Sequence, residues 1–498
     1  MRSKSTTEEV KCDIVIVGAG GAGMAAAVAA TEEGVKDIVL LEERIGPGGN
    51  TAMAAGLFAV ESPAQKRLGI RIGRDEYFRK YMDYCHWKVN PSLVRVLINK
   101  SADTIRWLEE MGVVFGRVFS LYANQPATFH YADGSNWVGA AVSKALARKC
   151  QELGIRLMRR TAGKRLLTDA KGNVTGVEAT TKEKKLKITA KCVIIATGGC
   201  LGNKEMLKKY YPDYSEQLDI AGLLPKGDGI RMGMEVGAAI EGMGTLEMNG
   251  PDFEFKKRCL TLCQVAIQPW TLWVNKRGER FTDESIANRH FGESSNCVVR
   301  QPGMISYTLF DTKIKQHITE VEQEGFLIMW RVGLTKYVWK KDELPELDKL
   351  FQKYVDLGRI KISDSWDEIA KWMGAAPKVL KATVDEYNSF CDQGYDENFV
   401  KERRHLMPLR TPPYYAMETH THVYNTVGGL KVNHRMEVLN KQDNPIRGLY
   451  ATGMDMGGWE TDTYNAGIAG HSIGFAVNSG RIAGEIAAEY VLGGKTKK

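Results

Sequence analysis

The sequence lacks the features that mark membrane and exported proteins. No apolar run approaches the roughly 20 residues that a membrane-spanning helix needs. Arg2 and Lys4 near the start are followed by Glu8, Glu9 and Lys11 rather than by the apolar core of a signal peptide. We therefore expect a cytoplasmic protein without a membrane span.

Cysteine is present, but not in the arrangements that form known sites. The nine cysteines are scattered, with no CxxC pair and no CxxCH haem-attachment motif. Cys259 and Cys263 are four residues apart, without the second pair that a zinc site requires. The sequence thus predicts free thiols, a reducing compartment and no metal site.

Basic residues exceed acidic ones, but they are dispersed. The formal net charge is +8 at pH 7 over 498 residues. No repeat of base-stacking aromatic residues and no nucleic-acid module accompanies this charge, so we expect no nucleic-acid partner. A modest basic surface remains compatible with an acidic redox partner or an anionic substrate.

The chain begins with a strand, a glycine loop and a helix. Gly18, Gly20 and Gly23 form a GxGxxG loop, and Glu42 ends the next strand 19 residues after Gly23. The first glycine allows a tight turn, the second lets the backbone approach a pyrophosphate, and the third allows helix and strand to pack closely. Glu42 is placed to accept a ribose hydroxyl. The elements predicted around this loop are a strand over 12–17, a helix over 24–33 and a strand over 38–41.

A second glycine run distinguishes between two dinucleotides. Gly48, Gly49, Asn50 and Thr51 follow shortly after Glu42. NAD needs only the first loop, so this additional run favours FAD. An NAD-binding dehydrogenase without flavin is the alternative.

Composition changes along the chain indicate one domain interrupted by another. Glycine-rich strand–turn–helix segments dominate both ends, whereas the middle is richer in aromatic residues. Full hydrophobicity over 192–196 predicts a strand buried on both faces of a parallel sheet. Helices are predicted within 76–116, over 136–155 and over about 470–492, and strands over 165–169 and 174–181. The predicted division is 1–248 and 426–498 for one domain, with 249–425 inserted.

Several segments in a fixed order resemble the flavoprotein subunit family of fumarate reductase and succinate dehydrogenase, which also includes 3-ketosteroid dehydrogenases and enone reductases. Each segment alone is a weak signal, but their order runs through nearly the whole chain. They are residues 18–23, 41–42, 48–56, 196–199, 227–232, 278–284, 412–416, 426–430 and 448–453 with 480–484.

The resemblance implies an α/β fold: a bipartite Rossmann-like FAD-binding domain with an inserted α+β capping domain over the flavin. Family members with covalent flavin carry a histidine near the position of Asn50, so its absence implies non-covalent FAD. Met454 stands where such proteins often carry an acid to the ribitol, and Asp455 is expected to be only its neighbour. The residues expected to bind the cofactor are Gly18, Gly20, Gly23, Glu42, Gly49, Asn50, Thr51, Gly56, Thr197, Gly198, Gly199, Asp228, Gly429 and Gly453.

The fumarate-binding residues of the family are mostly missing. Fumarate reductases bind a dicarboxylate with two histidines and two arginines, and Asn249 and Asn425 stand near the positions of the two histidines. The late arginine has no counterpart. The remaining arginine, which delivers the proton in the family, is matched only by Arg289, one residue further along than expected. Fumarate is therefore a disfavoured substrate.

The late segment resembles the ketosteroid dehydrogenase pattern instead. There a tyrosine hydroxyl and a glycine N–H bind the carbonyl oxygen of an enone, and Tyr464 and Gly470 match, with two extra residues between them. A donor at this oxygen stabilises the charge that hydride addition creates. Tyr464, Gly470 and Arg289 are thus the expected catalytic residues, and Asn425 and His130 the expected substrate contacts.

Other residues have competing interpretations. Tyr464 is also suited to a buried structural role, and Arg289 to an ion pair with Asp283, Glu284 or Glu293. His290 has a better pKa for proton transfer than Arg289, but no family precedent. His420 and His422 alternate like one face of a strand, which favours packing over zinc binding.

The sequence therefore predicts an FAD-dependent oxidoreductase acting on CH–CH bonds. It would reduce, or form, a carbon–carbon double bond conjugated to a carbonyl by hydride transfer at flavin N5. An apolar enone such as a 3-oxosteroid is the expected substrate; the alternatives are an unsaturated carboxylate, as in fumarate reductase, or a non-catalytic flavin-binding redox protein. An external partner protein, reduced nicotinamide or reduced flavin is expected to exchange electrons with it.

Overall fold

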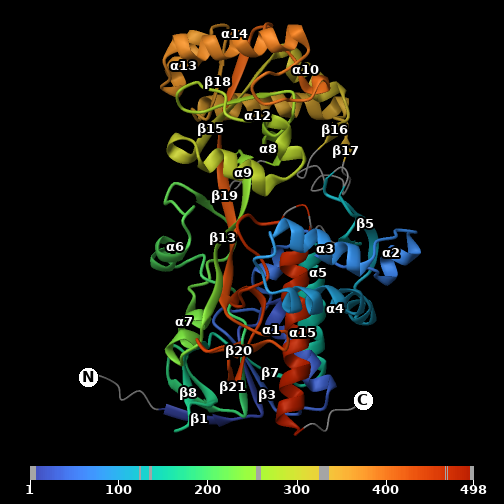
Figure 1. Cartoon of the computed structure of the whole chain (residues 1–498), viewed down its shortest axis with the longest axis vertical. Helices are drawn as coiled ribbons and strands as arrows, with labels where there is room; N and C mark the ends of the chain where they lie inside the picture. Colours follow the sequence, from blue (N-terminus) through green and yellow to red (C-terminus); the bar gives the residue numbers. More distant parts are fainter. Residues whose placement is uncertain are drawn as a thin grey trace.

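The chain folds into two stacked lobes, seen in the computed structural model (Figure 1). The structure describes residues 7–122, 125–133, 137–253, 260–324, 336–465, 467 and 469–493. Both ends of the chain lie in the lower lobe, which we call the base, and the middle of the chain builds the upper lobe, which we call the cap (Figure 1).

A mostly parallel sheet forms the centre of the base. Its strand order is β20-β21-β11-β2-β3-β7, and only β20 pairs antiparallel. The middle strands are short, apolar and fully buried, because helices and further strands cover both faces. Their bounds are β2 Ile14–Val17, β3 Ile38–Glu42, β7 Arg156–Arg159, β11 Cys192–Ile195, β20 Glu437–Leu439 and β21 Pro445–Ala451.

The first and last long helices of the base pack against each other. These are α1 (Gly21–Glu32) and α15 (His471–Val491). A Cβ at Gly480 would lie 2.2 Å from the Ala22 carbonyl oxygen, and one at Gly484 would lie 2.3 Å from that of Ala26. Glycine at these two positions is therefore what lets the backbones of the two helices approach so closely.

Smaller sheets and helices surround this core. One sheet has the order β1-β10-β9-β8 and another the order β4-β6-β5. Their strands are β1 Thr7–Lys11, β4 Leu57–Phe58, β5 Phe115–Phe119, β6 Phe129–Ala132, β8 Ala162–Thr168, β9 Val174–Thr180 and β10 Lys185–Thr189. The helices are α2 Pro63–Arg67, α3 Arg74–Tyr84, α4 Pro91–Glu110, α5 Val138–Glu152, α6 Lys204–Tyr210 and α7 Asp228–Glu235.

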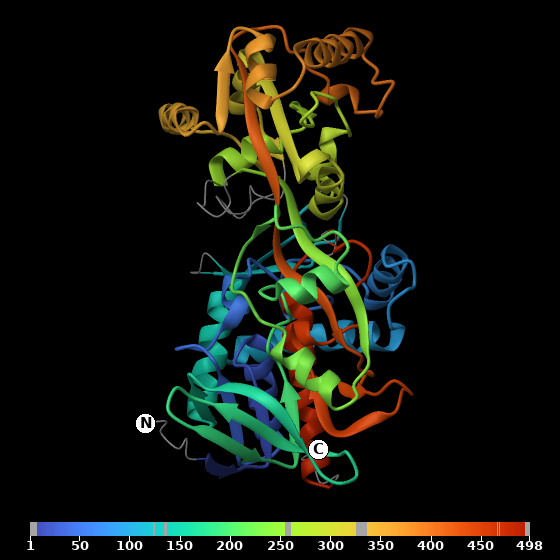
Figure 2. The same cartoon turned by 90° about the vertical axis from the view of Figure 1, so that its left-hand side faces the viewer.

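Two long strands join the base to the cap. β13 (Ile240–Asp252) and β19 (Tyr414–Leu430) pair antiparallel and run through the narrow waist of the molecule (Figure 2). In the cap β19 also pairs with β15 (Ile305–Asp311) and β18 (Ile360–Ser363). The boundaries predicted at 249 and 425 fall inside these two long strands, so the division into domains stays a prediction.

Helices and short strands complete the cap, as expected for an α+β insertion. Its helices are α8 Leu260–Ala266, α9 Phe291–Val299, α10 Thr312–Glu320, α12 Leu344–Asp356, α13 Trp366–Met373 and α14 Pro377–Gln393. Its other strands are β14 Leu272–Val274, β16 Gln323–Glu324 and β17 Lys336–Tyr337, and β12 Asp219–Ile220 joins the β19 sheet from the base side.

Most predicted elements are present. The helical pattern within 76–116 is divided between two helices, α3 and α4. His86 and Trp87 between them have φ values of 49° and 57°, which no helix accommodates, and Pro91 starts the second helix. In the described parts of the chain, no helix combines the length and apolar character that crossing a membrane requires.

Candidate functional site

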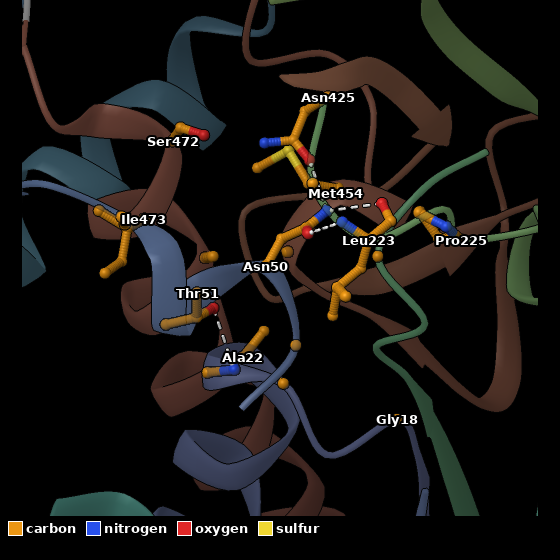
Figure 3. A pocket seen from close by; sticks show the side chains of 18 of the residues that line it. Gly18, Ala22, Asn50, Thr51, Leu223, Pro225, Asn425, Met454, Ser472 and Ile473 are labelled. Atoms are coloured by element: carbon orange, nitrogen blue, oxygen red, sulfur yellow. Dashed lines mark hydrogen bonds between the residues drawn. The ribbon is translucent and has the colours of Figure 1, made fainter. Parts of the chain in front are cut away.

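A cavity of about 520 Å³ lies where segments from the first half of the chain meet segments from its last part. Its walls come from the carboxyl ends of β2, β3 and β11, from the turn η1 (Gly49–Met53), and from the start of α15 (Figure 3). In open α/β sheets ligands bind beyond the carboxyl ends of the strands. Eleven of the predicted cofactor residues line it: Gly18, Gly20, Glu42, Gly49, Asn50, Thr51, Gly56, Thr197, Gly198, Asp228 and Gly453.

The glycines of the first loop differ in the space around them. A Cβ at Gly18 would lie 2.2 Å from the Ala196 carbonyl oxygen, and one at Gly23 would lie 1.9 Å from that of Gly18. Gly20, by contrast, borders the cavity, and a Cβ there would have no neighbour within 4 Å. The start of α1 thus presents free space and backbone N–H groups, an arrangement that suits a pyrophosphate.

Glu42 is held in a fixed orientation at the end of β3. Its Oε2 accepts a hydrogen bond from the Ala19 amide at 3.1 Å, and its Oε1 accepts one from the Arg44 amide at 2.8 Å. The carboxylate lines the cavity and is mostly buried. This is the position from which an acid binds a ribose hydroxyl.

Asn50 connects three separate segments at the cavity wall. Its Oδ1 accepts from the Leu223 amide at 2.8 Å, and its Nδ2 donates to the Leu223 carbonyl at 3.3 Å and to Asn425 Oδ1 at 3.2 Å (Figure 3). Thr51 Oγ1, beside it, accepts from the Gly21 amide at the start of α1, at 3.1 Å. The second glycine run therefore holds the first loop, the 222–225 segment and β19 together.

Asp455 has a larger role than its expected one of a mere neighbour. Its carboxylate is fully buried and accepts hydrogen bonds from the Thr197 amide and hydroxyl and from the amides of Gly198 and Gly199. It therefore fixes the loop after β11 against the end of β21. Sequence reasoning missed this, because the contact joins residues 258 positions apart.

Three predicted cofactor residues stand behind the cavity wall rather than on it. They are Gly23, Gly199 and Gly429. A Cβ at Gly199 would lie 2.7 Å from Thr426 Oγ1, and one at Gly429 would lie 2.2 Å from the Asp455 carbonyl oxygen. These glycines allow close packing of the segments that form the wall.

The end of the cavity near the cap is polar and centred on Glu247. This residue lies on β13 opposite Asn425 on β19. Its Oε2 accepts from Asn425 Nδ2 at 2.9 Å and from Ser472 Oγ, at the start of α15, at 3.1 Å. The sequence analysis did not identify Glu247. The available signal was an acidic residue between apolar residues of one strand, because burying a charge without a partner costs free energy and so suggests a function.

Tyr464 and Gly470, two predicted catalytic residues, line the same end of the cavity. Burial, and then the charge of Glu247, raise the pKa of Tyr464 well above its usual value. The Tyr464 ring stacks on His471, with ring centroids 4.6 Å apart, and His471 Nε2 lies 3.0 Å from the carboxylate of Glu460. Gly470 has φ +83° and caps α15, and a Cβ there would lie 2.7 Å from the Phe58 amide nitrogen.

The charges that line the cavity are unevenly placed. Among the described lining residues the only cations are Arg44 and Lys226. The amide of Arg44 binds Glu42, and Lys226 pairs with Glu43, so both belong to the end of the cavity at β3. Burial raises the pKa of the Glu247 carboxyl, and hydrogen bonds from Asn425 and others partly oppose that rise.

His130 does not contact the cavity, contrary to prediction. Neighbouring residues of a strand point to opposite faces, and Phe129 lines the cavity, so His130 faces away. Its ring is buried, with Nε2 2.6 Å from Ser62 Oγ and Nδ1 2.9 Å from the Thr128 carbonyl oxygen. Burial lowers its pKa to about 4.

Arg289 also lies away from the cavity wall. Its side chain is 57% exposed and pairs with Asp283 at 2.8 Å. This is the ion pair that was weighed against a proton-donor role. The neighbouring His290 is buried, caps α9 and stacks on Tyr84, with ring centroids 5.2 Å apart, and burial lowers its pKa to about 4.

His420 and His422 are engaged in separate ion pairs. His420 Nε2 lies 3.0 Å from Glu418, and His422 Nδ1 lies 2.9 Å from Asp252. Within the described residues no cluster of three or more potential metal ligands is found.

Comparison with known proteins identifies relatives of the whole chain. Residues 13–470 match the protein family described as "FAD binding domain". The chain is 31% identical over 490 residues to the vinyl phenol reductase of Lactiplantibacillus plantarum, covering 96% of each protein. It is 29% identical over 482 residues to a fumarate reductase (cytochrome) of Shewanella frigidimarina, covering 96% of this chain and 77% of that protein.

Solved structures share the fold. The 3-ketosteroid Δ4-(5α)-dehydrogenase of Rhodococcus jostii RHA1, determined with 4-androstene-3,17-dione, superposes with a TM-score of 0.74 at 22% identity, covering 98% of this chain and 99% of that one. The predicted resemblance and the predicted FAD-binding α/β fold are thereby confirmed.

Proposed function

The chain belongs to the FAD-binding domain family, and we propose that it reduces a carbon–carbon double bond conjugated with a neutral, oxygen-bearing group. It is an FAD-dependent oxidoreductase, so the alternatives of an NAD-binding protein without flavin and of a non-catalytic flavoprotein are wrong. The non-covalent attachment of FAD, its binding residues and the substrate are parts of the proposal.

The residues around the cavity fit FAD. The start of α1 offers amide N–H groups and open space at Gly20 for the pyrophosphate, and Glu42 is oriented to accept a ribose hydroxyl. The start of α15 adds a second helix N-terminus, whose partial positive charge suits a ring system that becomes negative on reduction. When bound and reduced, FAD supplies the hydride from N5.

The substrate assignment rests on the described residues that line the cavity beside Glu247, among which there is no arginine or lysine. Proteins bind carboxylates through arginine, lysine or protonated histidine. Among the described residues that line the cavity, the two cations lie at the opposite end, beside Glu42 and Glu43. A carboxylate substrate would face Glu247 without a countercharge, so this arrangement supports a neutral substrate.

The remaining groups at this end suit an oxygen-bearing conjugated molecule. Tyr464 is placed to donate a hydrogen bond to the substrate oxygen, on which negative charge grows as the double bond accepts hydride. Phe291 and Tyr424 contribute aromatic surface to the same wall. Asn425, the predicted substrate contact, acts through the hydrogen bond that orients Glu247.

The relatives support a reductase of unsaturated compounds. One is named for vinyl phenol and another for fumarate. The first substrate is neutral, as the cavity requires, and the second is a dicarboxylate that the cavity disfavours. An apolar enone, including a 3-oxosteroid, stays within the proposed class, although the likeness to a steroid dehydrogenase supports only the fold.

A steady-state assay tests this proposal. The holoenzyme would be supplied with reduced methyl viologen and, separately, with 4-vinylphenol, an apolar enone and fumarate. We expect oxidation of the dye, and a product two hydrogens heavier, with at least one neutral alkene. Turnover with fumarate alone would overturn the assignment.

The electron donor is external in this proposal. A partner protein, reduced nicotinamide or reduced free flavin would serve. Anaerobic mixing of the oxidised holoenzyme with NADH and with reduced FMN separates these sources: bleaching by either identifies a small-molecule donor, whereas bleaching only by a cell fraction containing protein identifies a partner.

A further inference from the structure

We propose that Glu247 recognises a hydroxyl group of the substrate and acts as its base, so that the preferred substrate is an alkene conjugated with a hydroxyl-bearing aromatic ring. This inference rests on the proposed function and narrows its substrate class. It assigns a role to Glu247, the acid that lines the end of the cavity near Tyr464 among the described residues.

The hydrogen bonds around Glu247 define its orientation. A carboxylate has about four lone-pair directions. Asn425 and Ser472 donate to Oε2. The Tyr464 hydroxyl also stabilises the carboxylate, and its one proton would turn to the substrate oxygen when a substrate hydroxyl takes its place on Glu247. These partners hold the carboxylate at the cavity wall and leave it capacity for one more donor.

Glu247 and Tyr464 together discriminate between types of oxygen. A hydroxyl donates one hydrogen bond and accepts others, so it can donate to Glu247 while it accepts from Tyr464. A ketone oxygen only accepts, and would leave Glu247 without its additional donor. A carboxylate would add like charge beside Glu247, and so would be repelled.

The neighbouring side chains favour an aromatic ring. Phe291, Tyr424 and Tyr464 line this end of the cavity. Aromatic surfaces prefer to pack against other aromatic rings in offset or edge-to-face arrangements. A phenol with a conjugated double bond satisfies both the carboxylate and this aromatic wall.

The proposed proton transfers balance. Glu247 takes the phenolic proton, the oxygen electron pair moves into the ring, and the terminal alkene carbon takes a proton derived from water, which gives a quinone methide. Bound reduced flavin would supply the hydride that the benzylic carbon accepts, and Glu247 would return its proton to the oxygen as the electron pair moves back there. The net uptake is one hydride and one proton, and the alkene becomes an alkane.

The first test compares probes that differ by one group on the wild-type holoenzyme. These are 4-vinylphenol, its methyl ether 4-vinylanisole, and 4-hydroxycinnamate, which adds a carboxylate. Sites that bind a substrate hydroxyl reject analogues without it by large factors. We expect kcat/KM for vinylphenol to exceed that for each of the others by about 100-fold. Activity with none of these probes, while an apolar enone is reduced, would overturn this inference and leave the proposed function standing; activity with neither the probes nor the enone would refute both.

The second test uses Glu247→Gln, with Glu247→Asp as a variant that keeps the charge. Glu247→Gln should retain flavin, reduce the vinylphenol-to-vinylanisole ratio to below about 10, and improve the relative rate with 4-hydroxycinnamate. Flavin content and Tm establish that each variant is folded, and Glu247→Asp should restore part of the ratio. Glu241→Gln is the matched control, because Glu241 lies on the same strand outside the cavity lining.

A pH profile separates a chemical role from a structural one. The titratable groups near Glu247 include Tyr424, Tyr464 and His471. In the wild type kcat/KM for vinylphenol should fall at low pH as Glu247 is protonated, and this acid limb should disappear in Glu247→Gln. A folded Glu247→Gln that keeps the wild-type probe ratio and acid limb, while the wild type still reduces vinylphenol, would overturn the role of Glu247 and leave the proposed function standing.

Discussion

Asn50 and Asn425 are 375 positions apart in the sequence, yet Asn50 Nδ2 donates a hydrogen bond to Asn425 Oδ1 at 3.2 Å. Asn425 in turn donates to Glu247 at 2.9 Å. One chain of hydrogen bonds therefore runs from the second glycine run to the acid at the cap end of the cavity. We expect this chain of hydrogen bonds to couple cofactor binding to substrate binding.

Replacement of Asn50 should weaken both functions. Asn50→Ala removes three hydrogen bonds, to Leu223 and Asn425, and each lost partner of a buried group costs about 1–3 kcal/mol. We expect at least a tenfold weaker affinity for FAD, measured by fluorescence titration of the apoprotein. Asn50→Asp keeps the hydrogen bond from the Leu223 amide, so its affinity for FAD should lie between those of the wild type and Asn50→Ala. An affinity for FAD in Asn50→Ala equal to that of the wild type would contradict this coupling.

FAD should be released without cleavage of a covalent bond. No histidine occupies the position of Asn50, whose side chain instead makes hydrogen bonds. Precipitation of the holoprotein with acid should leave yellow flavin in the supernatant, and a colourless gel band should result under denaturing conditions. Flavin that stays with the precipitated protein would refute the prediction.

Tyr464→Phe tests the hydrogen-bond donor at the substrate oxygen. Removal of one such donor typically costs about 10²–10³ in rate. We expect flavin binding to be retained. The rate constant for reoxidation of the reduced flavin by substrate, measured by stopped-flow absorbance, should fall by about 100-fold. Tyr490→Phe is the control, since Tyr490 lies near the far end of α15 and is 36% exposed. Unchanged turnover would remove Tyr464 from the mechanism.

Asp455 should be essential for a well-formed cofactor loop. Its carboxylate accepts four hydrogen bonds from the 197–199 segment, and bonds to charged groups contribute about 1.5–3 kcal/mol each. Asp455→Asn substitutes a donor for an acceptor there, so the purified protein should contain less flavin and unfold at lower temperature. The exposed Asp443→Asn should match wild type in both, and normal flavin content in Asp455→Asn would disprove this role.

Two buried histidines should make the fold sensitive to acid. Burial lowers the pKa of His130 and of His290 to about 4, whereas an unfolded histidine has a pKa of about 6.5. The unfolded state then binds more protons between these values, so stability is full above pH 6.5 and is lost as pH falls towards 4. Each residue contributes up to about 3 kcal/mol to this loss.

Urea unfolding between pH 4 and pH 7 measures this effect. His130→Asn should reduce the slope of unfolding free energy against pH, even where it lowers stability overall. His434→Asn, at an exposed position, should leave the slope unchanged. An identical slope of unfolding free energy against pH in the wild type and in His130→Asn would contradict the lowered pKa of His130.

The fold was largely predictable because its signals are local. The GxGxxG loop, the apolar strand over 192–196 and the glycine-rich last helix each have short-range patterns that only a few structures satisfy. The boundary between domains was harder to predict. β13 and β19 continue from base to cap without a break. The amino-acid composition therefore changes at this boundary, whereas the secondary structure does not.

The substrate end was less predictable because its contacts are distant in sequence. The role proposed for Glu247 depends on its hydrogen bonds with Asn425 and Ser472, which lie far from it in the sequence and approach it only in the folded protein. His130 was predicted to contact the substrate, but the alternation of side chains along its strand directs it away from the cavity. Arg289 matched a family pattern with one extra residue, and that insertion accompanies a side chain directed to Asp283 and solvent.

The most direct test of the account is the rate at which fully reduced holoenzyme is reoxidised by a matched pair of substrates under anaerobic conditions. 4-Vinylphenol and 4-hydroxycinnamate differ only by a carboxylate, and the second-order rate constants for flavin reoxidation exclude any effect of the electron donor. The account predicts that the neutral compound reacts at least about 100-fold faster, because a carboxylate would lie beside Glu247, where the described lining residues include no arginine or lysine. Equal rates, or faster reaction of the carboxylate, would contradict it.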